Sequence, residues 1–170
     1  PTAKEHDDPD MEALARYWVN KTEVVAKLKD KWDRGWLLGW RDITNASNER
    51  TFVPSVFPRS AVGDKFLLAF TSDSATAHCL HAVWSSLVFD YVSRQKISGT
   101  AMKYFTVKQL ACPTPETFSA ATGWHRDCTL AEWVRPYVLE LAYTSWRLKP
   151  YAEDLGDHGP PFHWDPDRRA

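Results

Sequence analysis

The sequence lacks the features that mark several protein classes. It has only three cysteines in 170 residues. An odd number without CxxC spacing favours free thiols in a reducing compartment over a disulfide framework. No apolar run approaches the roughly 18 residues that a membrane-spanning helix needs, and no signal-peptide pattern is present. We therefore expect a cytoplasmic localisation and no membrane partner.

Catalytic motifs are equally scarce. The sequence contains no GxSxG, Walker or GxGxxG pattern, and its six histidines form no HExxH arrangement. His78 and His81 are three residues apart, but two ligands alone favour a structural role over a metal site. The tetrapeptide at 159–162, GPPF, looks like the Asn/Asp-Pro-Pro-aromatic motif of amino-methyltransferases. Gly159, however, has no side chain to accept a hydrogen bond from a target amino group. We expect no catalysis by this chain alone, and no metal or cofactor in it.

The chain is rich in aromatic residues. Nine tryptophans and a 44% hydrophobic content predict a single domain with its own core. The net charge of −1 gives no overall attraction for nucleic acid, but residues 41–115 hold eight Lys/Arg against five Asp/Glu, about +3. Both ends are acidic. A local excess of this size can bind phosphates, and it also fits an ordinary surface.

Periodicity predicts the elements of the first half. Asn20 and Glu23 form a capping-box pattern for a helix that should end before Gly35, an interpretation we prefer to one long helix from Met11. Apolar segments at 36–44, 51–57 and 65–70 predict three strands. One amphipathic helix should then carry the apolar positions from Leu80 to Val92, beginning at a cap in 72–74 and ending at Ser98-Gly99.

In the second half, residues 104–110 have a strand-like pattern, and two prolines in 112–118 argue against regular structure there. Thr129 and Glu132 form a second capping box, although Pro136 should break or restart that helix. We predict an α+β fold: a small mixed or antiparallel sheet packed against two or three helices. The expected boundaries are a loose acidic segment at 1–14, a single domain at 15–148 and a proline-rich strap at 149–170, the whole being a fragment of a larger protein.

Two segments carry a resemblance to known proteins. RDITNASNERT (41–51) lies at the tip of the first predicted hairpin, and SGTAMKYFTVKQLACPTP (98–115) follows the long predicted helix. The second segment resembles the distal part of target-recognition domains in restriction-modification enzymes. Together with 15–24, 36–70, 87–110, 138–146 and 159–169, the two resemble the C-terminal region of Eco57I-like N6-adenine DNA methyltransferases, which act in restriction-modification or phage defence.

The resemblance implies a DNA-binding target-recognition domain. The methylase core would be a partner in the same polypeptide, and that parent protein would use S-adenosylmethionine. Base edges and phosphates of double-stranded DNA are contacted by Arg, Lys, Asn, Ser and Thr side chains. The candidates here are Arg41, Asn45, Asn48, Arg50, Arg59, Lys96, Ser98, Thr100, Lys103 and Lys108.

Each candidate also has a structural alternative. Glu49 and Arg50 can pair across a turn, Asn45 and Asn48 can shape the loop, and the Arg41 stem can cover an apolar edge. A different function is a docking module that contacts the methylase core or a partner subunit. That hypothesis predicts exposed aromatic side chains among the candidates Trp36, Trp40, Trp124, Trp133, Trp146 and Trp164. A free-standing enzyme has the least support.

Overall fold

The fold is built on a three-stranded antiparallel sheet, seen here in a computed structural model that describes residues 2–12, 15–73, 76–125, 127–163, 165 and 167. The strands are β1 (Trp36–Arg41), β2 (Pro54–Pro58) and β3 (Phe66–Ala69), in the order β2-β1-β3. The predicted α+β class and the three predicted strands are confirmed, with shorter strands than the apolar segments suggested.

The central strand β1 is buried along nearly its whole length. Its first five residues are buried and only Arg41 is exposed. Trp36 makes edge contacts with Trp32 and Tyr151, and Trp40 packs against Phe52 and Trp84. A strand covered on both faces has a continuous apolar sequence instead of an alternating one, which is why WLLGW is apolar at every position.

The helix after Asn20, α2 (Lys21–Leu28), is short, as preferred from the sequence. The Asn20 side chain caps it by accepting a hydrogen bond from the Thr22 amide at 3.0 Å, in place of the Glu23 amide that a capping box would use. The helix ends at Leu28, well before Gly35. A short helical turn, α1 (Ala3–His6), lies in the acidic N-terminal segment.

The long amphipathic helix predicted for the middle of the chain is two helices, so that prediction was wrong. They are α3 (Ala77–Ser85) and α4 (Leu87–Lys96), and Ser86 between them is extended. The Ser86 hydroxyl accepts a hydrogen bond from the Phe89 amide, so it caps α4. Because the break rotates α4, Leu87 and Tyr91 are 75% and 65% exposed, whereas Phe89 and Asp90 are buried. The predicted cap for α3 includes Ser74, which lies outside the described residues; the observed N-cap is Thr76.

Two further predictions for the second half were wrong. The strand-like segment 104–110 contains a helical turn, α5 (Tyr104–Val107), and the proline-rich stretch contains α6 (Pro115–Ser119). A 3-10 turn, η2 (Trp146–Leu148), ends the predicted domain, and the predicted strap at 149–170 begins with helix α8 (Lys149–Asp154). Pro115 and Pro150 each lie in the first turn of a helix, where a missing N–H costs nothing.

Helix α7 (Leu130–Ala142) confirms the second capping box. The Thr129 amide donates to Glu132 Oε2 at 2.7 Å and the Glu132 amide to Thr129 Oγ1 at 3.2 Å. Pro136 lies inside α7 without ending it, contrary to prediction. The Pro136 ring is exposed and takes no part in the core. The burial of Val138 and Leu139 stabilises the helical turn that follows it.

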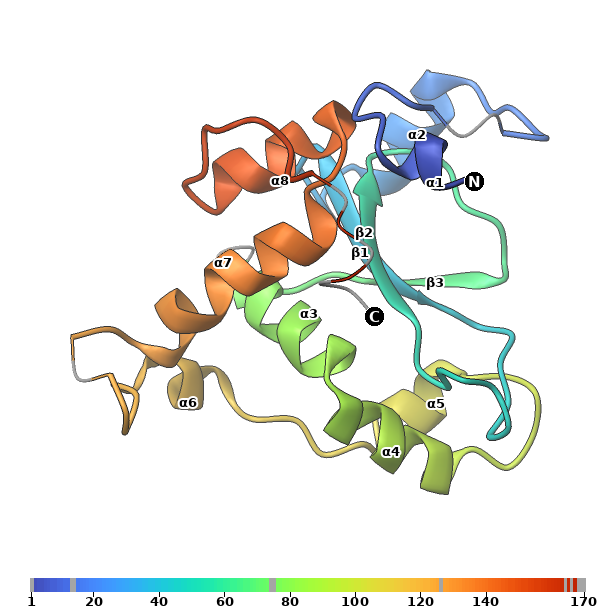
Figure 1. The fold of residues 1–170 in the computed structure, drawn as a ribbon. Coiled ribbons are helices and arrows are strands. Elements are labelled where there is room, and N and C mark those ends of the chain that lie inside the picture. The colour runs from blue at the N-terminus through green and yellow to red at the C-terminus, as the bar shows by residue number, and fades with distance from the viewer. Residues whose placement is uncertain are drawn as a thin grey trace.

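The helices surround the sheet unevenly. Figure 1 shows α3, α7 and α8 gathered beside β2, with α2 at one end of the strands and the 42–53 loop at the other, near α4 and α5. Contacts of α3 with β2 and α7 and of η2 with β2 close the core on that side. Within the described part of the chain, every helix is too short or too polar to cross a bilayer.

Candidate nucleic-acid interface

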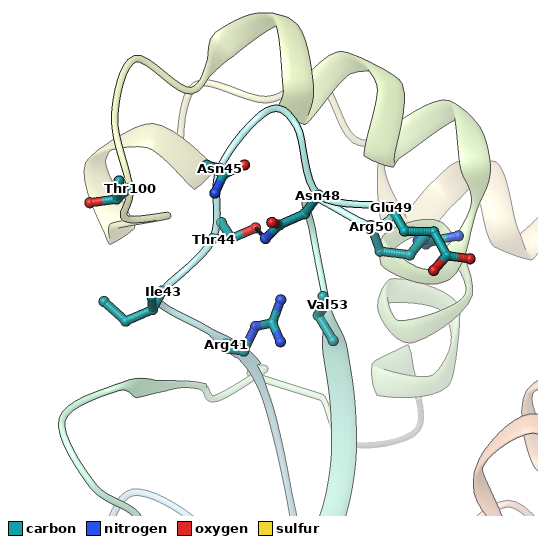
Figure 2. A pocket seen from close by; sticks show the side chains of 9 residues that line it. All are labelled: Arg41, Ile43, Thr44, Asn45, Asn48, Glu49, Arg50, Val53 and Thr100. Atoms are coloured by element: carbon teal, nitrogen blue, oxygen red, sulfur yellow. Dashed lines mark hydrogen bonds between the residues drawn. The ribbon is translucent and has the colours of Figure 1, made fainter.

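A concavity of about 630 Å³ lies against the loop that joins β1 and β2. Five of the ten predicted DNA-contacting residues line it, which places the sequence RDITNASNERT at a hollowed surface (Figure 2). We call this concavity the hairpin-loop pocket. It is lined by Arg41, Ile43, Thr44, Asn45, Asn48, Glu49, Arg50, Val53 and Thr100.

Both loop asparagines take part in shaping the loop. Asn45 Oδ1 accepts hydrogen bonds from the amide and the hydroxyl of Ser47, at 2.9 and 2.7 Å. Asn48 Nδ2 donates to Thr44 Oγ1 at 3.2 Å, and the same hydroxyl donates to the Thr51 carbonyl at 2.7 Å. Asn45 and Asn48 therefore do shape the loop, as the structural alternative predicted. Each side-chain amide still has hydrogen-bonding capacity for a further partner.

The buried Asp90 of α4 ties the loop to the helix. Its Oδ1 accepts the amides of Thr51 and Phe52, both at 2.8 Å. Its Oδ2 accepts from Arg94 at 3.1 Å, and Arg50 Nε lies 3.6 Å from Oδ1. Because the carboxylate receives two backbone donors and two guanidinium groups, its charge is well compensated despite its burial.

Arg50 is therefore held by the scaffold. Its Nη2 donates to the Ser85 carbonyl at 2.8 Å, and its ion-pair partner is Asp90, not the neighbouring Glu49. The side chain lines the hairpin-loop pocket, but part of its charge is used within the fold. Sequence reasoning missed Asp90 and Arg94; their i,i+4 spacing on a helix was the available signal.

A second buried carboxylate holds Lys103. Asp42 is fully buried and its Oδ2 lies 2.7 Å from Lys103 Nζ. The residues just before Lys103 run antiparallel to 42–44: Ile43 bridges Ala101, and the Thr44 amide donates to the Thr100 carbonyl at 3.1 Å. The SGT segment thus adds a single bridge to the hairpin instead of a full strand, and it brings Thr100 to the pocket rim.

Arg41 differs from these two cations. It is exposed at the end of β1, and no side-chain partner for it occurs among the described residues. Figure 2 shows its guanidinium directed into the hairpin-loop pocket, below Asn48 and beside Val53. Its five donors are thus presented to a ligand instead of being used inside the fold.

The remaining candidates lie outside this pocket. Lys96 ends α4, Ser98 follows in the exposed loop and Lys108 lies just after α5, all three exposed. Arg59 follows β2 at the opposite end of the hairpin and lines a different cavity. The structure brings together Arg41, Asn45, Asn48, Arg50 and Thr100, and it does not bring Arg59 or Lys108 to them.

The chain was also compared with known proteins. No protein-family model, curated protein or solved structure matches it. The family assignment suggested by the sequence accordingly stays a prediction.

Proposed function

We propose that this chain is a DNA-contacting target-recognition domain and that the hairpin-loop pocket contacts duplex DNA. The observation that carries the proposal is Arg41, an arginine without a partner in the described structure that points into a polar concavity. A guanidinium in this setting suits a bidentate contact with a phosphate or with a guanine edge.

The neighbouring groups extend the proposed contact. Asn45 and Asn48 provide amide groups, and Thr100 provides a hydroxyl on the opposite rim. Lys96 and Ser98 lie in the chain just before Thr100 and suit phosphate contacts. Arg50 and Lys103 contribute mainly by holding the loop, since each is paired with a buried carboxylate. Removing either side chain should therefore destabilise the fold as well as weaken DNA binding.

The wider assignment follows from the resemblance alone. We propose that the parent protein is a cytoplasmic adenine-specific DNA methyltransferase with an S-adenosylmethionine-dependent core, and that this chain has no catalytic activity by itself. The chain would present DNA to that core.

Fluorescence anisotropy with a labelled duplex tests the proposal. At low salt the chain should bind weakly, and affinity should fall as salt rises. Arg41→Gln should weaken binding about tenfold and flatten the salt slope by about one unit. Arg147→Gln is the matched control, because Arg147 is a half-exposed arginine outside the pocket. Equal binding by the two variants, or no binding at low salt, would count against the proposal.

A docking module remains the second candidate, and the exposed face of α4 favours it. Leu87, Val88 and Tyr91 are all largely exposed. Of the tryptophans considered, Trp124 and Trp146 are exposed, Trp133 is partly buried, and Trp36 and Trp40 belong to the core. Trp164 lies outside the described residues. Under this hypothesis, Leu87→Gln with Tyr91→Gln in the parent protein should weaken contact with the methylase core and leave DNA binding by this chain unchanged.

A further inference from the structure

A second cavity, of about 640 Å³, lies at the other end of β1 from the hairpin-loop pocket. Its walls come from the C-terminal end of α2, the turn at 29–34, the residue after β2 and the segment after β3. Leu28 and Trp32 form part of an apolar side. The basic and hydroxyl side chains that line it are Lys29, Lys31, Arg34, Arg59, Thr71 and Ser72, and Asp30 and Asp33 are the acidic ones. We call it the α2-end pocket.

Three polar atoms in this lining are buried without a hydrogen-bond partner among the described residues: Arg34 Nε, Arg59 Nε and Thr71 Oγ1. Arg34 Nε still forms an ion pair with Asp33, which leaves Arg59 Nε and Thr71 Oγ1 without either kind of contact. The Arg59 backbone is fixed, since its amide donates to the Gly35 carbonyl at 2.9 Å, but its guanidinium forms no ion pair with any described residue. A buried donor left without an acceptor is destabilising, so an unpaired guanidinium N–H is unusual inside a folded domain.

The charge of the lining is positive. Four cations, Lys29, Lys31, Arg34 and Arg59, face two carboxylates, Asp30 and Asp33, which leaves a net +2. Arg34 is the compensated member, lying 3.3 Å from both Asp33 and Asp154. With Arg34 and Asp33 set aside, the net +2 comes from Arg59 in the wall and the two exposed lysines, less the charge of Asp30.

We propose that the α2-end pocket binds a phosphate group. Arginine offers parallel N–H donors that match two oxygens of a phosphate, and the hydroxyls of Thr71 and Ser72 supply neutral donors beside it. Lys29 and Lys31 add charge from flexible stems. A phosphate would give Arg59 Nε and Thr71 Oγ1 the partners that the described residues do not provide.

The proposed site is separate from the one that contacts DNA through Arg41. The six residues of β1 span about 20 Å at the usual rise of a strand, so one phosphate cannot reach both pockets. The phosphate can come from a free ligand such as a nucleotide or from the backbone of DNA bound along the domain. Both sources present the same chemistry to Arg59.

Titration of the 170-residue chain with pyrophosphate, at ionic strength held constant with sodium chloride, tests the proposal. Intrinsic fluorescence should change saturably, because Trp32 lines the pocket, and the melting temperature should rise. Arg59→Gln should raise the dissociation constant at least tenfold and Thr71→Val several-fold, whereas Arg147→Gln should have no effect. A parallel titration with AMP asks whether a base adds affinity.

The source of the phosphate is decided by repeating the duplex-DNA titration with pyrophosphate at saturation. Loss of DNA affinity in the wild type but not in Arg59→Gln assigns the pocket to the DNA backbone, and unchanged affinity in the wild type assigns it to a free phosphate ligand. Absence of saturable binding by both pyrophosphate and AMP would overturn the proposal. So would equal affinities of the Arg59→Gln and Arg147→Gln variants. If Arg59→Gln does not fold, Thr71→Val tests the proposal instead, because it nearly preserves the side-chain volume. Unchanged pyrophosphate binding by Thr71→Val would equally overturn the proposal.

Discussion

Replacement of Asp90 tests whether the hairpin loop is held by α4. In Asp90→Ala, the amides of Thr51 and Phe52 lose their acceptor, and Arg50 and Arg94 lose a carboxylate. Removing one member of a buried charge network typically costs about 3–5 kcal/mol. Hydrogen bonds to a charged group contribute about 1.5–3 kcal/mol each, so the two amide bonds alone account for most of that loss.

Asp90→Asn separates these two contributions. It retains an oxygen for the Thr51 and Phe52 amides and removes only the charge. Since Arg50 and Arg94 are about one-third exposed, their ion pairs should each contribute no more than about 1 kcal/mol. We therefore expect Asp90→Asn to lower the free energy of unfolding by at most about 2 kcal/mol, less than Asp90→Ala does.

Urea unfolding followed by tryptophan fluorescence measures both variants, and hydrogen exchange locates the effect. The Thr51 and Phe52 amides should exchange slowly in the wild type and rapidly in Asp90→Ala, whereas strand β1 amides should change little. A loss below about 1 kcal/mol in Asp90→Ala would refute the reasoning. It would mean that the loop is held by its own hydrogen bonds at Thr44 and Asn45.

Two other predictions concern the core. Burial, with a smaller effect from His78, lowers the pKa of His81 to about 4, below its usual 6.5. Between these two pH values the unfolded chain binds a proton at His81 that the folded chain does not bind. About 3 kcal/mol of stability that is present above pH 6.5 should therefore be lost as the pH falls towards 4. Urea unfolding at stepped pH should show this loss, and His81→Gln should remove it; an unchanged pH dependence in the variant would contradict the assignment. Gly39→Ala should lower the free energy of unfolding by about 2–3 kcal/mol, because a Cβ there would collide with the Leu67 carbonyl oxygen and lie 2.6 Å from a Phe66 ring carbon. Thermal unfolding measures this loss. Wild-type stability of the variant would show that β3 can shift to make room.

The sheet and the N-caps of α2 and α7 were predictable because their signals are local. An apolar run bounded by turn residues identified β1, and the Thr129–Glu132 spacing identified the start of α7. Segment 104–110 was misassigned because its β-branched and aromatic residues suit a strand. Pairing with the hairpin ends at 101–102, and a helical turn then buries Thr106 and Leu110. The break at Ser86 was hidden since apolar residues continue across it at helical spacing.

The candidate site was predictable to the extent that it is contiguous in sequence. Arg41, Asn45, Asn48 and Arg50 share one loop, and only Thr100 required a tertiary contact, the bridge between Ile43 and Ala101. The separation of Arg59 followed from the hairpin itself. Trp36 pairs with Pro58, so the residue after β2 must lie at the start of β1, away from Arg41. The sequence could not predict which cations form ion pairs within the fold, because Asp42 and Asp90 are buried by packing between segments that are distant in the sequence.

The internal ion pairs limit how strongly this chain can bind DNA. In the basic stretch 41–115, Arg50 and Arg94 face Asp90, Lys103 faces Asp42, and Lys65 faces Asp64. The described residues provide no ion pair for Arg41, Arg59, Lys96 or Lys108. Each phosphate contact contributes roughly 0.9 to the salt slope, so even engagement of all four gives a slope of only about −4. Binding by the isolated chain should therefore be weak and largely abolished at moderate salt, and tight recognition would need additional contacts from the rest of the parent protein.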